Sequence, residues 1–117
     1  MSDKLVANIL EGCPYSENAE KLLNKYNARY TKVPVSYSNK SDKQFNIMKT
    51  FPQIYLVSKN KEKHIMGGYD ELNKFYKNYE SIDKKKNPLK VLDSLSHVSN
   101  RKSILLKLAL NLLNGLR

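Results

Sequence analysis

Short apolar runs alternate with segments of helical periodicity along residues 1–82 of the chain. Four runs have β-strand character and are bounded by turn-forming residues: residues 4–10 (KLVANIL), 29–36 (RYTKVPVS), 51–58 (FPQIYLVS) and 63–67 (KHIMG). Three segments have helical spacing: residues 14–26, 42–49 and 69–81. The order β-α-β-α-β-β-α predicts an α/β fold with a four-stranded mixed sheet, built from a β-α-β unit and a following hairpin, with helices on both faces.

Residues 83–117 form a separate segment, which we expect to be a basic linker followed by extra C-terminal helices. Asn87 and Pro88 indicate the start of a short helix, in which Leu89, Leu92 and Leu95 recur at helical spacing.

A second helix should begin after a cap at Ser99 or Asn100 and end near Gly115. Its apolar residues surround most of the helix: Ile104, Leu105, Leu106, Leu108, Leu110, Leu112, Leu113 and Leu116. A helix this apolar must bury itself, so we expect it to pack on the domain of residues 1–82 or on a second copy of the chain.

The net charge of +10 is concentrated toward the C-terminus. Residues 1–82 carry 13 Lys and Arg against 9 Asp and Glu, whereas residues 83–117 carry 8 against 2. The densest run, Lys84 to Lys86, is typical of a solvated linker, so no specific nucleic-acid partner is predicted.

The chain has one cysteine, which excludes an internal disulfide framework, and no Cys/His cluster has zinc-site spacing. No secretory signal pattern opens the sequence, and no apolar run reaches the roughly 20 residues needed to span a bilayer. These features predict a cytoplasmic protein.

The single thiol, Cys13, stands directly before a predicted helix, with Pro14 at its first position. Unpaired N–H groups and the macrodipole at a helix N-terminus favour negative charge, so the reactive thiolate of Cys13 should be stabilised. A buried, inert cysteine is the alternative, but the cap position and the following proline favour a nucleophile.

Three motifs in the predicted order resemble those of the glutaredoxins, which have the thioredoxin fold. They are "CPYS" (residues 13–16), "TFP" (residues 50–52) and "GGYDEL" (residues 67–72), and the resemblance covers residues 4–82. It implies a glutathione-dependent thiol–disulfide oxidoreductase with Cys13 as its catalytic residue. It also implies a cis peptide before Pro52 and a glutathione site formed by Tyr15, Thr50, Phe51, Pro52, Gly68, Tyr69 and Asp70.

The resemblance implies how the γ-glutamyl end of glutathione is held. The backbone N–H groups of Tyr69 and Asp70, at a helix N-terminus, would bind its carboxylate, and the Asp70 carboxylate would pair with its ammonium.

The chain departs from the family in two places. Many members have a lysine three residues before the cysteine, where this chain has Leu10. The helix expected before "TFP" is also short, so spacing leaves the residue that meets the glycine carboxylate of glutathione open among Lys43, Gln44 and Lys49. His64 and His97 have no partner pattern and are interpreted as structural or exposed.

Ser16 occupies the place of the second cysteine of dithiol members, so the predicted mechanism is monothiol. Cys13 would take the glutathionyl group from a glutathionylated protein, and a second glutathione would then release it. The alternative is a dimeric carrier of a [2Fe-2S] cluster ligated by Cys13 and glutathione, with Cys13 as the only metal ligand of each chain. A non-enzymatic interaction module acting through the basic tail ranks third. The expected partners are glutathione and glutathionylated or disulfide-containing proteins.

Overall fold

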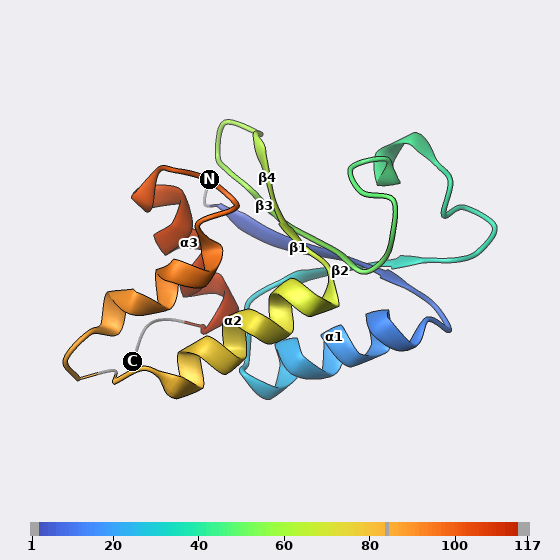
Figure 1. Ribbon diagram of the computed structural model, residues 1–117. Helices are drawn as coiled ribbons and strands as arrows, with labels where there is room; N and C mark the ends of the chain where they lie inside the picture. Colours follow the sequence, from blue (N-terminus) through green and yellow to red (C-terminus); the bar gives the residue numbers. More distant parts are fainter. Residues whose placement is uncertain (1–2, 84, 115–117) are drawn as a thin grey trace.

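The computed structural model describes residues 3–83 and 85–114 (Figure 1). Three residues of the sequence interpretation, Lys84, Gly115 and Leu116, lie outside the described residues. Along the chain the elements are β1 (Lys4–Leu10), α1 (Pro14–Lys25), β2 (Thr31–Val35), the 3₁₀ helix η1 (Lys43–Phe45), β3 (Gln53–Val57), β4 (Lys63–Gly67), α2 (Tyr69–Ser81), the 3₁₀ helix η2 (Pro88–Leu95) and α3 (Lys102–Leu112).

The strands form one mixed sheet in the order β2-β1-β3-β4. β1 is parallel to β2 and antiparallel to β3, and β3 pairs with β4 as a hairpin. β2 is an edge strand, which tolerates the missing N–H of Pro34. The predicted α/β class and the four-stranded mixed sheet are confirmed.

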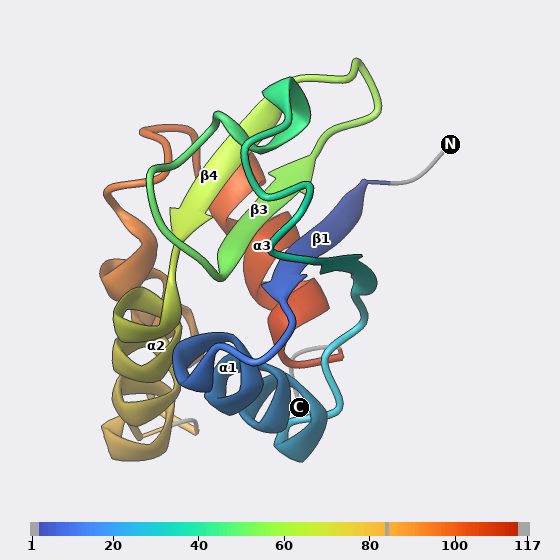
Figure 2. The ribbon, with the colours of Figure 1, turned by 90° about the vertical axis from the view of Figure 1, so that its right-hand side faces the viewer.

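One face of the sheet carries the main hydrophobic core. Alternate positions of the central strands, among them Leu5, Ala7 and Ile54, belong to one buried cluster that also includes residues of α1, α2, η2 and α3. In Figure 1, α1 and α2 lie side by side on this face, and the two helices are in contact. In Figure 2, α3 lies behind the sheet, on the side away from the loop described next.

The opposite face is covered by the loop of residues 36–52, drawn in green in front of the sheet in Figure 2. The α-helix predicted over residues 42–49 is wrong, because only Lys43–Phe45 forms a single 3₁₀ turn. The segment is too short for a stable helix by itself, and the carbonyl oxygens of Phe45 and Met48 instead accept hydrogen bonds from Gln53. Among the described residues the α-helices therefore lie on one face of the sheet, and the helix expected on the other face is reduced to the 3₁₀ turn η1.

The C-terminal segment packs on the same core as α1 and α2. Its buried residues are Val91, Leu92, Leu95, Ile104, Leu105, Leu108, Ala109 and Leu112. Leu89, expected on the same side of the first tail helix as Leu92 and Leu95, is 55% exposed, whereas Val91, which was not among the expected residues, is buried.

Three bonds tie α3 to distant parts of the chain. Tyr76 Oη donates a hydrogen bond to the Leu112 carbonyl (2.7 Å), and the Arg29 N–H donates to the Asn111 carbonyl (2.8 Å). Lys107 Nζ forms an ion pair with Asp3 at 3.4 Å.

The start of α3 differs from the prediction. Its N-cap is Arg101, without a side-chain cap, and the Ser99 hydroxyl accepts a bond from the Arg101 N–H one residue outside the helix. Within residues 3–83 and 85–114, no helix is long and apolar enough to cross a membrane.

Candidate active site

Cys13 is the N-cap of α1, as the sequence predicts. Its backbone is extended (φ −93°, ψ 119°), Pro14 follows at the first helical position, and the Cys13 carbonyl accepts the first helical bond from Glu17. The thiol makes no cap hydrogen bond and is half-buried. It therefore stands free at a helix end whose unpaired N–H groups favour an anion.

The turn between β1 and α1 fixes the direction in which Cys13 points. Gly12 has φ +77°, a left-handed conformation that glycine adopts without strain. The Glu11 N–H bonds to the Val35 carbonyl (2.8 Å) and the Cys13 N–H to the Leu10 carbonyl (3.2 Å). The turn is thus anchored to two strands of the sheet.

Ser16 has a structural role that sequence reasoning missed. It is fully buried, and its hydroxyl oxygen accepts a hydrogen bond from the Leu10 N–H at 3.1 Å. The serine therefore satisfies a buried donor at the end of β1.

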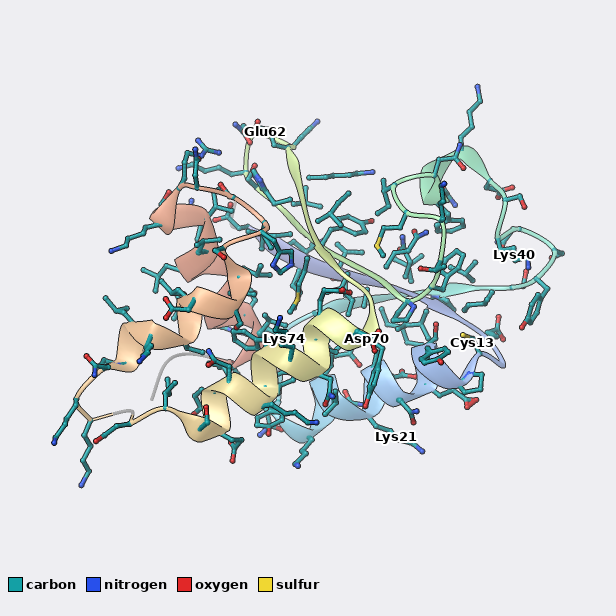
Figure 3. The ribbon with its side chains drawn as sticks, viewed as in Figure 1. Cys13, Lys21, Lys40, Glu62, Asp70 and Lys74 are labelled. Atoms are coloured by element: carbon teal, nitrogen blue, oxygen red, sulfur yellow. The ribbon has the colours of Figure 1, made fainter. Side chains whose placement is uncertain are left out.

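Two adjoining hollows open beside Cys13. The thiol hollow, about 370 Å³, is lined by Leu10, Cys13, Tyr15, Lys40, Ser41, Lys49, Thr50 and Phe51. The helix hollow, also about 370 Å³, is lined by Tyr15, Met48, Thr50, Phe51, Gly68, Tyr69, Asp70 and Glu71. They share Tyr15, Thr50 and Phe51, so one continuous surface leads from the thiol to the start of α2. Figure 3 shows Cys13 and Asp70 at the same end of the paired helices.

The structure therefore brings together seven of the eight predicted site residues in the linings of these two hollows. The exception is Pro52, which is buried behind them. The Phe51–Pro52 peptide is cis, as expected. A larger hollow of about 550 Å³, between α2 and η2, shares Asp70 and Glu71 but contains no thiol.

Steric crowding explains why both positions of the Gly67-Gly68 pair are glycine. The Glu71 side chain folds back over them, and its Oε1 accepts a hydrogen bond from the Gly68 N–H at 2.8 Å. A Cβ on Gly67 would lie 2.6 Å from that oxygen, and one on Gly68 would lie 3.3 Å from the Pro52 carbonyl. Gly68 lines the helix hollow, but its N–H is already occupied.

At the start of α2, the N–H groups of Tyr69 and Asp70 come before the first helical donor, which is the Leu72 N–H bonded to the Gly68 carbonyl. The rings of Tyr15 and Tyr69 lie 6.4 Å apart between their centroids and flank this helix end. Glu71 was not among the predicted site residues, although its spacing from Gly68 is that of a capping box.

A buried amide pair positions the loop that forms the far wall. Asn8 Nδ2 donates to Gln53 Oε1 (3.0 Å), and Gln53 Nε2 donates to the carbonyls of Phe45 (2.8 Å) and Met48 (3.1 Å). Sequence reasoning missed both amides. Their signal was a polar residue at an inward position of each central strand.

Of the three residues left open for the glycine carboxylate, Lys49 lines the thiol hollow, while Lys43 and Gln44 are not in its lining. Lys40 and Ser41 line it too and were not predicted. Among the described residues, no group of three or more His, Cys, Asp and Glu side chains is placed to hold a metal ion. His97 Nε2 lies 2.7 Å from the Met66 carbonyl, and His97 lines the hollow between α2 and η2 but neither of the two hollows beside Cys13.

A scan against models of known protein families finds no match for this chain, and a search of curated proteins finds none either. The glutaredoxin resemblance therefore rests on the three motifs, and the function it implies is a proposal.

Proposed function

We propose that the protein is a glutathione-dependent thiol–disulfide oxidoreductase of the glutaredoxin class, acting by a monothiol mechanism through Cys13. The observation that carries the proposal is the continuous surface from the half-buried Cys13 thiol to the start of α2 at Asp70. It combines a nucleophile at one helix N-terminus with an anion-binding helix N-terminus beside it.

The strand arrangement supports a thioredoxin-like fold. The strand order β2-β1-β3-β4, with one parallel pair followed by an antiparallel hairpin, agrees with what the resemblance implies. The proposed domain spans residues 1–82, and the tail adds η2 and α3 to the helical side of the sheet.

The two hollows offer complementary groups to the two charged ends of glutathione. The Tyr69 and Asp70 N–H groups would bind the γ-glutamyl carboxylate, and the exposed Asp70 carboxylate would pair with the adjacent ammonium. Lys49, across Thr50 and Phe51, would meet the glycine carboxylate. The cysteinyl sulfur of glutathione then lies between these ends, beside Cys13.

The reaction consists of two balanced exchanges. The Cys13 thiolate attacks the glutathione sulfur of a protein–glutathione disulfide; a Cys13–glutathione disulfide forms, and the protein thiolate leaves and takes up a proton. The thiolate of a second glutathione then attacks the bound glutathione sulfur, so that oxidised glutathione leaves and the Cys13 thiolate is restored. The protein cysteine is reduced, and two glutathione units end as one disulfide.

Ser16 restricts the enzyme to this route. A hydroxyl cannot form a disulfide, and the Ser16 oxygen is engaged with the Leu10 N–H. Only a second glutathione can therefore resolve the Cys13–glutathione intermediate. We propose a cytoplasmic location, where glutathione is kept mostly reduced.

Turnover of a small glutathione mixed disulfide, coupled to glutathione reductase, tests the proposal. We expect the wild type to turn over and to show a glutathione adduct on Cys13 by mass spectrometry, whereas Cys13→Ser loses both and keeps the fold. A wild type without turnover or adduct contradicts the proposal. A brown, glutathione-dependent dimer after anaerobic purification would favour the cluster carrier instead.

A further inference from the structure

Two of the exposed large hydrophobic side chains flank Cys13. Tyr15 is 62% exposed and Tyr37 is 61% exposed. Tyr15 follows Cys13 by two residues, and Tyr37 Cε2 lies 4.0 Å from the position of a Cβ on Gly12. Tyr15 already belongs to the proposed glutathione surface, but Tyr37 lines neither hollow.

Tyr37 is held out from the sheet by a hydrogen-bonded turn. The Ser36 N–H donates to Asn39 Oδ1 (2.9 Å), and the Asn39 N–H donates back to the Ser36 carbonyl (3.2 Å). The turn fixes the backbone on both sides of the Tyr37 ring. Binding a partner here therefore costs little conformational entropy for ordering this backbone.

Lys40 lies on this ring, with its Nζ 4.8 Å from the Tyr37 centroid. In Figure 3, Lys40 lies on the far side of Cys13 from Asp70. The segment of residues 36–50 carries Lys40, Lys43 and Lys49 against Asp42, so it remains positive even with Glu11 on the neighbouring turn. None of these three lysines has an ion pair among the described residues.

A second Lys–Tyr pair in the molecule shows the contrast. Lys63 lies 5.5 Å from the Tyr55 centroid, but Tyr55 is only 8% exposed and covers the sheet. Tyr37, in contrast, is 61% exposed. Tyrosine is enriched at the centres of protein interfaces, and a lysine beside it on the polar rim steers partners of opposite charge.

We propose that Tyr37 and Lys40 form a docking surface for the polypeptide of a glutathionylated substrate protein, one with acidic residues next to its modified cysteine. The inference rests on the proposed function and extends it from the glutathione half of the substrate to the protein half. Glutathione between Asp70 and Lys49 leaves Tyr37 uncovered, and the leaving protein thiolate departs on this open side. The charge of Lys40, which lines the thiol hollow with Cys13, selects acidic flanks and speeds their encounter.

Two glutathionylated peptides of equal length, one with Glu and Asp and one with Lys and Arg beside the modified cysteine, test the surface. We expect kcat/KM of the wild type to be about tenfold higher for the acidic peptide at low ionic strength, with the preference shrinking in 0.5 M salt. Lys40→Glu should abolish or invert the preference. Tyr37→Ala should lower kcat/KM for the acidic peptide about fivefold and leave the small mixed disulfide unaffected.

Two control variants are matched to these changes. Lys43→Glu makes the same charge change on the same loop, outside the thiol hollow, and Leu89→Ala removes another exposed apolar side chain on η2. Neither should alter the peptide preference by more than about twofold.

Three outcomes overturn the docking surface. They are equal turnover of both peptides, an equal effect of Lys43→Glu and Lys40→Glu, and inhibition by a short single-stranded oligonucleotide that Tyr37→Ala relieves, which would assign the surface to nucleic acid. In all three, the wild type still turns over the small mixed disulfide. Loss of that turnover in the wild type would instead overturn the proposed function.

Discussion

The two faces of the sheet are covered in different ways. Among the described residues, the helical face carries a cluster of 19 buried residues from three strands and four helical elements, whereas the loop face carries a cluster of three, Leu10, Val35 and Phe45. The loop face is held instead by the Asn8–Gln53 amide pair and its bonds to the loop carbonyls. Most of the folding free energy should therefore reside on the helical face, while the loop face shapes the wall beside Cys13.

Removing α3 should have the largest effect, because it opens the helical face. Deletion of residues 99–117 exposes or removes five buried side chains: Ile104, Leu105, Leu108, Ala109 and Leu112. At about 1.5–3 kcal/mol for each large side chain, the loss exceeds roughly 5 kcal/mol, comparable to the whole stability of a small domain. We expect a truncated chain that is insoluble or unfolded by circular dichroism.

A single substitution keeps this test interpretable if the truncated chain cannot be purified. Leu108→Ala should lower the free energy of unfolding by about 2–5 kcal/mol in urea and leave kcat/KM per folded molecule unchanged. A truncated chain with the wild-type urea midpoint would show that α3 adds nothing to the core.

Gln53→Leu attacks the loop face and should come second. It leaves the carbonyls of Phe45 and Met48 and the amide of Asn8 without their partner, which costs about 2–3 kcal/mol. Because the loop carries Thr50 and Phe51, KM for glutathione should rise as well. Asn60→Ala is the control, since that amide bonds Glu62 in the exposed hairpin turn and lies outside the linings of both hollows. Equal KM values for glutathione in both variants would show that the Asn8–Gln53 amide pair does not position the glutathione site.

The same contrast decides what the sequence could predict. The apolar stripe of α2 depends on local periodicity, so the sequence predicts its start at Tyr69 and its end near Ser81. The loop of residues 42–49 was misassigned because its conformation depends on Gln53, a partner outside the segment. The Gly67-Gly68 motif located the start of α2, but only the structure shows Glu71 closing over it. The buried bond of Ser16 to Leu10 was invisible for the same reason.

Alkaline pH should weaken the helical face selectively, through Tyr76. Burial raises the pKa of Tyr76 well above the ordinary value of 10.0, and its hydroxyl donates to the Leu112 carbonyl. The unfolded chain ionises near pH 10, while the folded chain keeps the phenol neutral. The stability from this group is therefore complete below pH 10 and is lost above it, by about 1.4 kcal/mol per pH unit.

Urea unfolding at pH 8, 10 and 11 measures this loss. Tyr76→Phe should be less stable at pH 8, by about 0.5–1.5 kcal/mol for the missing hydrogen bond, but should have a shallower alkaline slope. Some slope should remain, because burial also raises the pKa of Tyr55. An unchanged slope in Tyr76→Phe would assign the alkaline loss to other groups.

Asp70→Asn should have the smallest effect on stability and tests glutathione binding at the start of α2. It removes the proposed partner of the glutathione ammonium while keeping the shape of an exposed side chain, so KM for glutathione should rise about three- to fivefold, as for an exposed ion pair. The free energy of unfolding should change by less than about 1 kcal/mol, the value of one charge at a helix N-terminus. Glu71→Gln is the matched control, because it makes the same charge change one residue away and its amide oxygen can still accept the Gly68 N–H. Equal KM values for glutathione in the two variants would mean that Asp70 senses only the general potential of the helix end and does not bind the ammonium.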